Sequence, residues 1–97
     1  MKLRFTLRAT QDLIEIADYI RERNPVAALR VRAAILNSLQ NLVLFPQVGR
    51  RQKLEGVRKL VTRRYPYLVY YTIDLTNEEI IILTIQHPAR EREHEDA

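Results

Sequence analysis

The chain has 97 residues and a net charge of +4, with 13 arginines among its 16 basic residues and no cysteine. A chain of this length has room for one domain, residues 1–97, with a single two-layer core, so it excludes a separate cofactor domain and we expect no cofactor. The lack of cysteine excludes a disulfide framework and a thiolate zinc site, and no apolar stretch is long enough to span a bilayer, so we expect a cytoplasmic protein without membrane contact.

The first 20 residues predict a short strand followed by a helix. Residues 2–6 alternate polar and apolar side chains, which is typical of a strand with Leu3 and Phe5 facing inward. Thr6 is a typical helix N-cap. Apolar side chains then recur at spacings of three and four over about four turns, which places them on one face of a helix. These residues are Ala9, Leu13, Ile16, Ala17 and Ile20.

A second helix is expected directly after the first. Asn24 and Pro25 predict the boundary, because an asparagine N-cap followed by proline at the first helical position starts a new helix. An apolar stripe continues to about Leu44, and Pro46 ends the helix. The two helices should form an antiparallel hairpin.

Beyond Gly49 the pattern changes to that of strands. Residues 57–64 alternate, residues 67–74 are rich in β-branched and aromatic side chains, and a turn at 76–78 precedes a run of isoleucines from residue 80 to 85. Three consecutive strands predict an antiparallel meander. The element order is therefore βααβββ, an α+β fold in which the helical hairpin packs on one face of a small, mainly antiparallel, four-stranded sheet.

The isoleucine run at 80–85 makes both faces of its strand apolar. Successive strand side chains point to opposite faces of the sheet, and a chain this short has few elements with which to bury both. We therefore expect a partner to cover the face that the helices leave open.

Residues 50–64 carry seven basic side chains against a single acid, Glu55. Arginine suits both carboxylate and phosphate partners, so a solvated surface and a surface for an anionic partner are both open explanations. Arg58 and Arg64 share one strand parity and Lys59 has the other. The sequence does not decide which of the two sets faces away from the helices.

The landmarks of the chain, taken together in order, resemble the RelE/ParE toxin superfamily, and within it the ParE or plasmid-stabilisation type more than RelE. The resemblance covers nearly the whole chain. Its landmarks are Ala9, Asp12 and Leu13 in the first helix, Tyr19 and Ile20 near its end, Pro25 and Ala28 in the second helix, Leu42, Phe45, Pro46, Gly49 and Arg50 after it, Tyr67 to Tyr71 in the middle strand, and Ile82 to His87 followed by Ala89 and Arg90.

This resemblance implies a toxin of a type II toxin-antitoxin system that a cognate, ParD-like antitoxin holds inactive. ParE-like toxins are understood to inhibit DNA gyrase by trapping its cleaved-DNA complex, and they are not hydrolases. Two alternatives are a RelE-like, ribosome-dependent mRNA endonuclease and a non-toxic relative that binds only the antitoxin. The residues expected on the surface for the target or the antitoxin are Arg50, Arg51, Lys53, Arg58, Arg64, His87 and Arg90. We also hypothesise that acids of the antitoxin pair with some of these arginines.

Proton-transfer groups are scarce in this chain. Cleavage of RNA through its 2′-hydroxyl needs a base, donors for the phosphate and an acid for the leaving oxygen. RNA-cleaving relatives usually place an aromatic or histidine side chain in the final segment beside the basic cluster, whereas no tyrosine follows Tyr71 and His94 lies in an acidic run. We therefore expect no catalytic residue and no metal site.

Two residues near the end of the chain have alternative explanations. His87 either ends the last strand, hydrogen-bonded to nearby backbone, or acts directly in function. Arg90 either lies on the working surface that the resemblance implies or pairs with Glu91 or Glu93. Whether the charged tail 91–97 packs on the sheet is open.

Overall fold

Side-chain caps define both helices in the computed structural model, which describes residues 1–88. Helix α1, Leu7–Arg23, begins at Thr6, whose Oγ1 accepts a hydrogen bond from the Ala9 amide at 3.0 Å. Asn24 ends α1 and starts α2, Pro25–Leu44. Its Oδ1 accepts from the Ala27 amide at 3.1 Å, satisfying a helix N–H that has no partner inside the helix. The predicted helical hairpin and both of its N-caps are confirmed.

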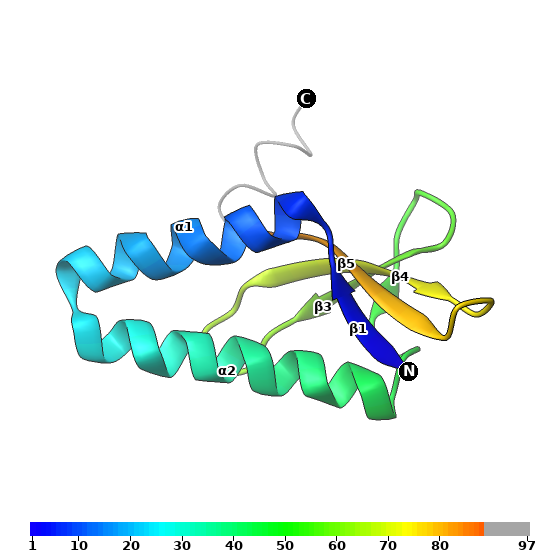
Figure 1. The fold of residues 1–97 in the computed structure, drawn as a ribbon, viewed down its shortest axis with the longest axis horizontal. Coiled ribbons are helices and arrows are strands. Elements are labelled where there is room, and N and C mark those ends of the chain that lie inside the picture. The colour runs from blue at the N-terminus through cyan, green and yellow to red at the C-terminus, as the bar shows by residue number, and fades with distance from the viewer. Residues whose placement is uncertain (89–97) are drawn as a thin grey trace.

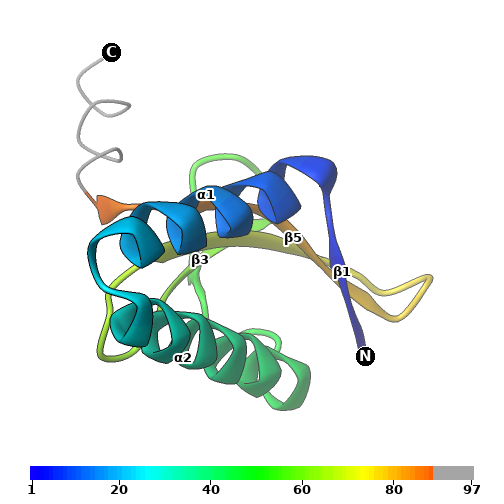
Figure 2. The ribbon, with the colours of Figure 1, turned by 60° about the vertical axis from the view of Figure 1, so that its left-hand side comes forward.

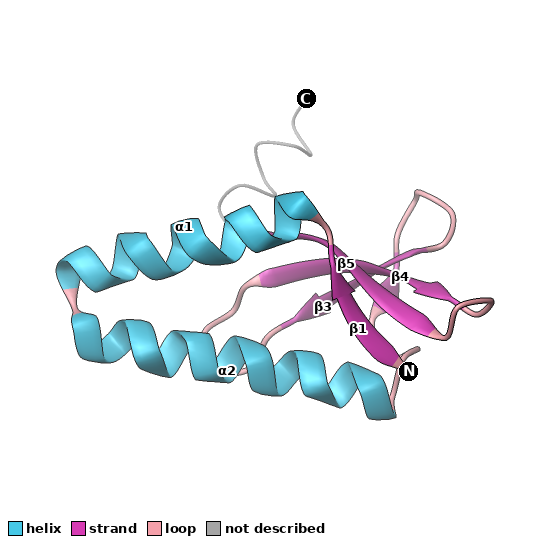
Figure 3. Ribbon diagram, viewed as in Figure 1, coloured by secondary structure: helices cyan, strands magenta, loops and turns pink. Residues whose placement is uncertain are grey.

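The sheet has five strands in the order β1-β5-β4-β3-β2, one more than predicted. Figure 3 labels β1, β5, β4 and β3 of this sheet. The strands are β1 Lys2–Phe5, β2 Arg50–Arg51, β3 Val57–Val61, β4 Leu68–Asp74 and β5 Glu79–Gln86. Strand β1 is parallel to β5, and the other pairs are antiparallel. The additional strand is β2. It has only two residues, so it shows no alternation in the sequence, and its pairing with β3 creates it.

Both helices pack on one face of the sheet (Figures 1 and 2). The α+β architecture and the position of the hairpin are therefore as predicted. The isoleucine run divides between the two faces. Ile80 and Ile82 are fully buried in the core with α2, and Ile81 lies on the opposite face and is half-buried. No helix of residues 1–88 is long and apolar enough to cross a membrane.

A β-bulge in β5 changes which side chains reach the core. Tyr70 pairs with Thr84 and Tyr71 pairs with Ile82, so Leu83 is an extra residue in β5. The extra residue shifts the parity of the strand, and Ile85 therefore joins Ile82 in the core instead of facing away.

Asp12 of α1 stabilises the bulge. This carboxylate is only 5% exposed, and its Oδ2 accepts hydrogen bonds from the Thr84 hydroxyl at 2.6 Å and from the Ile85 amide at 2.9 Å. Arg8, one turn earlier, lies 3.3 Å from its Oδ1. The buried charge is thus paired and hydrogen-bonded, which is the condition under which burial of a carboxylate is tolerated.

Strand β3 ends at Val61, three residues earlier than the alternation predicted. Thr62 closes the turn to β4: its amide donates to the Tyr67 carbonyl at 3.0 Å, and its hydroxyl accepts from the Tyr67 amide at 2.9 Å. Arg64 lies inside this turn with φ of 71° and is not in a strand. The expectation that Arg58 and Arg64 share a strand face is therefore wrong, because the turn redirects the chain between them.

Candidate binding surface

The hairpin of β2 and β3 brings together four of the basic residues. Arg50 is opposite Lys59, and Arg51 is opposite Arg58. Residues directly opposite in an antiparallel pair share a face, with Cβ atoms about 5 Å apart, and like charges in such pairs are destabilising. The hairpin therefore places positive charge on both of its faces.

The pairing of β3 with β4 decides which basic residues face the helices. Arg58 is opposite Tyr71, a core residue, so its side chain starts from the helix-covered face of the sheet. Lys59 is opposite Tyr70 on the face without helices. The question that the sequence left open is answered by this register: Lys59 is on the uncovered face, and Arg58 is on the covered one.

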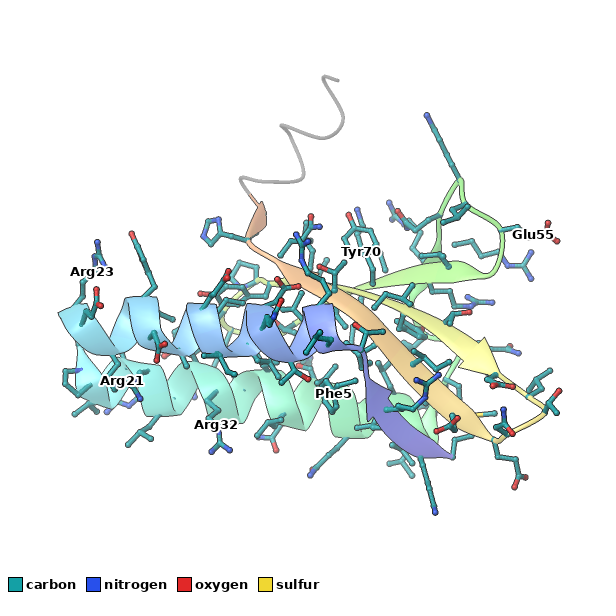
Figure 4. The ribbon with its side chains drawn as sticks, turned by 45° about the horizontal axis from the view of Figure 1, so that its top comes forward. Phe5, Arg21, Arg23, Arg32, Glu55 and Tyr70 are labelled. Atoms are coloured by element: carbon teal, nitrogen blue, oxygen red, sulfur yellow. The ribbon has the colours of Figure 1, made fainter. Side chains whose placement is uncertain are left out.

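Arg51, Lys53 and Arg58 line one hollow of about 550 Å³, which we call the cationic hollow. Glu55 and Ile73 also contribute to its wall. Glu55 is exposed and points outward from the loop between β2 and β3 (Figure 4). Within residues 1–88 no carboxylate oxygen lies within 4 Å of a side-chain nitrogen of Arg51 or Lys53. The described part of the chain leaves this positive charge for an anionic partner.

Arg58 also has a structural role. Its guanidinium Nη1 donates to the carbonyl of Gln47 at 3.0 Å and to the carbonyl of Gly49 at 2.8 Å. These two carbonyls belong to the loop 45–49, which connects α2 to β2. Because charged donors form the stronger hydrogen bonds, Arg58 fixes this loop as well as lining the cationic hollow.

Tyr71 holds the same loop from inside, a role that the sequence did not reveal. Its hydroxyl donates to the Pro46 carbonyl at 2.7 Å and accepts from the Gly49 amide at 2.8 Å. Burial raises the pKa of Tyr71, and the Gly49 amide and the charge of Arg58 oppose this rise. A Cβ at Gly49 would lie 2.5 Å from the Tyr71 hydroxyl oxygen, so only glycine allows this close approach.

Arg64 and His87 lie at the other end of the sheet. Gln86, the last residue of β5, is opposite Leu68, which is opposite Val61 at the end of β3. The length of β3, roughly 15 Å, therefore separates Arg64 and His87 from the cationic hollow. Arg90, the remaining predicted surface residue, lies outside the described residues.

His87 borders a groove with acidic residues in its wall. Its ring meets Tyr67 edge to face, with ring centroids 5.8 Å apart. The groove has a volume of about 460 Å³ and is also lined by Asp12, Glu15 and Tyr19. Burial, with a smaller contribution from Tyr19, raises the pKa of Tyr67. The carboxylates of this groove would repel a phosphate group.

No group of histidine and carboxylate side chains in residues 1–88 has the arrangement of a metal site. The cationic hollow offers charge and hydrogen-bond donors, which suit binding of an anionic surface. Of the predicted surface residues, the fold gathers Arg51, Lys53 and Arg58 and places Arg50 on the opposite face of the same hairpin. Arg64 and His87 are separated from them.

Known toxins resemble this chain over most of its length. A candidate toxin of Sinorhizobium fredii, Y4kP, is 37% identical over 86 residues, covering 89% of this chain and 86% of that protein. Toxin RelE2 of Caulobacter vibrioides is 33% identical, covering 89% of this chain and 93% of that protein.

A solved structure of the chromosomal ParDE system of P. aeruginosa matches with a TM-score of 0.78 and 30% identity, over 90% of this chain and 95% of that chain. A model for the ParE toxin of type II toxin-antitoxin systems matches residues 3–92. The chain therefore belongs to the ParE toxin family of type II toxin-antitoxin systems.

Proposed function

We propose that this toxin inhibits DNA gyrase by binding it and trapping its cleaved-DNA complex, that it cuts no nucleic acid itself, and that a cognate antitoxin neutralises it. The ParE family match supports the target, because gyrase inhibition is the activity that the resemblance to ParE implies. Solved relatives come from toxin-antitoxin systems, including a complex from Mycobacterium tuberculosis at 29% identity and a TM-score of 0.64, which supports the antitoxin partner.

The distance between the positive charge and the proton-transfer groups supports the proposal that this toxin does not itself cut nucleic acid. A general base must approach within about 3 Å of the proton that it removes. Ile81 is level with the start of β3, beside the cationic hollow, and His87 follows six residues later, one of which is the extra residue of the bulge, so roughly 15 Å of strand separates them. Among the described residues that line the hollow, Glu55 supplies the carboxylate, and it is exposed on a loop. This arrangement favours binding over RNA cleavage.

A second candidate function is ribosome-dependent cleavage of mRNA. Two relatives favour it, because the resemblance to RelE implies that activity. They are toxin RelE2 of Caulobacter vibrioides, at 33% identity, and the RelBE2 complex of Mycobacterium tuberculosis, at 29% identity. The uncompensated cations of the hollow would suit an RNA phosphate as well as a carboxylate.

A gyrase cleavage assay distinguishes the two functions. Purified toxin is mixed with purified gyrase, supercoiled plasmid and ATP, and linear DNA is scored after detergent and protease treatment. We expect linear product that disappears when antitoxin is added. A toxin that yields no linear DNA but cleaves mRNA on translating ribosomes would refute the gyrase proposal and establish the second candidate.

Paired charge reversals test the role of the cationic hollow. The double variant Arg51→Glu and Lys53→Glu should raise the toxin concentration needed for half-maximal linear DNA at least about tenfold, which corresponds to about 1.4 kcal/mol of binding. The matched control is Arg30→Glu with Arg32→Glu, which makes the same change in net charge at two exposed positions of α2. Figure 4 shows Arg32 pointing away from the sheet. Equal losses in both variants would show that net charge alone matters and would remove the hollow from the mechanism.

A further inference from the structure

Several large apolar side chains are exposed at one end of the molecule. Leu44 is 70% exposed and Leu75 is 77% exposed. They border a hollow of about 470 Å³ at the end of α2 and the turn between β4 and β5, on the right in Figure 1. Within residues 1–88, the side chains that line this hollow are all uncharged. We call its exposed apolar residues the apolar end patch; they are Met1, Leu44, Phe45, Val48 and Leu75.

The fold holds the loop part of this patch in place. The backbone amide of Phe45 donates to the Asn41 carbonyl at 2.9 Å, and the Val48 amide donates to the Phe45 carbonyl at 3.1 Å. Tyr71 and Arg58 hold the carbonyls and the amide of the same loop. Apolar side chains on a preorganised loop bind a partner with little further loss of conformational entropy, which favours a binding role.

The apolar end patch is continuous with the cationic hollow. Ile73 lines both hollows. Arg58 lines the cationic hollow, and its guanidinium contacts the carbonyl of Gln47, a residue of the apolar hollow. The two regions therefore form one surface, with an apolar part and a positively charged part.

We infer that this combined surface docks on a protein, and that its partner is gyrase, at a site where carboxylates border an apolar pocket. The inference rests on the proposed function and assigns this surface to the protein part of the gyrase-DNA complex. Arg51 and Lys53 have no carboxylate oxygen within 4 Å in residues 1–88, so carboxylates of a partner could pair with them at this surface. A nucleic acid would also supply anions, but duplex DNA presents mainly phosphate, sugar and base-edge hydrogen-bonding groups, so it would bury less leucine and valine surface than a protein pocket. Contiguous exposed apolar patches are typical of sites for proteins.

The experiment compares two matched double variants for binding to purified gyrase without DNA. The test variant is Leu44→Gln with Leu75→Gln. The control is Leu29→Gln with Leu7→Gln, whose wild-type side chains are 70% and 75% exposed and lie outside the patch. All four side chains are exposed, and glutamine has nearly the same helix propensity as leucine at the three helical positions, so neither variant should disturb the fold, which a thermal melt of each checks. Loss of the patch should weaken gyrase binding at least about 30-fold, as expected for an interface hot spot, while the control stays near wild type.

Three other results would each overturn the inference. Equal gyrase affinity of the test and control variants would remove the patch from the target interface, even where the wild-type toxin still poisons gyrase. A test variant that keeps its gyrase affinity but loses affinity for the antitoxin would assign the patch to the antitoxin. A wild-type toxin that arrests growth without binding or poisoning gyrase would refute the proposed function together with this surface.

Discussion

Replacement of Tyr71 by phenylalanine tests whether a buried hydroxyl fixes the loop that supports the candidate surface. The change removes one oxygen atom. In the wild-type protein that hydroxyl donates to the Pro46 carbonyl and accepts from the Gly49 amide. Tyr71 is fully buried, so phenylalanine keeps its ring in the core while both hydrogen bonds are lost.

The expected cost is roughly 2–3 kcal/mol of unfolding free energy. The Gly49 amide is buried and loses its acceptor, and a buried donor without a partner costs about 1–3 kcal/mol. The bond to Pro46 is only partly buried, so water can replace it, and its loss costs about 1 kcal/mol or less. For a domain of this size each kcal/mol corresponds to about 4–8 °C, so the melting temperature should fall by roughly 10–20 °C.

Thermal and urea unfolding, followed by circular dichroism, measure this loss. Tyr19→Phe is the matched control, because it removes the same atom from a side chain that is 60% exposed, and it should change stability by less than about 0.5 kcal/mol. Hydrogen exchange at the Gly49 amide adds a local reading and should accelerate in Tyr71→Phe. Equal stability of the two variants, with unchanged protection of Gly49, would refute the assigned role of the hydroxyl.

Three further changes test the same network and the bulge in β5. Gly49→Ala should destabilise by about 1–3 kcal/mol through overpacking against Tyr71. In urea, the double variant Gly49→Ala with Tyr71→Phe should lose less stability than the sum of the two single variants, because both changes disturb one contact. Strict additivity of the two losses would contradict that contact. Asp12→Ala should cost about 2–4 kcal/mol, since the buried Ile85 amide loses its acceptor; a loss below 1 kcal/mol in urea would show that water satisfies it. Burial raises the pKa of Tyr71, so the stability that its neutral phenol contributes is present below about pH 10 and is lost as the pH rises through the folded-state pKa. The alkaline unfolding curve should therefore flatten in Tyr71→Phe, and an unchanged curve would contradict this contribution.

Local signals in the sequence predicted the helices well. A cap depends on residues within three positions, so Thr6 and the pair Asn24 and Pro25 could be recognised directly. The bulge could not be recognised, because Ile85 reaches the core only through the extra residue Leu83, and its amide is satisfied by Asp12, 73 residues earlier. Such a feature depends on tertiary contacts that periodicity does not report.

The candidate surface was predictable in composition but not in arrangement. The density of positive charge indicated Arg51, Lys53 and Arg58 as candidates, and the fold brings these three residues together. Arg64 was grouped with Arg58 by strand parity, and this grouping is wrong because Thr62 turns the chain before Arg64. The apolar end patch was missed for a different reason: its residues come from separate segments that only the fold places together.

The distance between the two groups of basic residues limits how one antitoxin could cover both. Arg58 and Arg64 are separated by roughly 15 Å along β3 and the following turn. An extended segment covers about 3.3 Å per residue, so its acids would need a spacing of about five residues, whereas a helix would need about ten. Arg58 also holds the carbonyls of Gln47 and Gly49, so reversal of its charge would disturb the loop as well as any partner. Arg51 and Lys53 are exposed, and substitution there separates binding from folding.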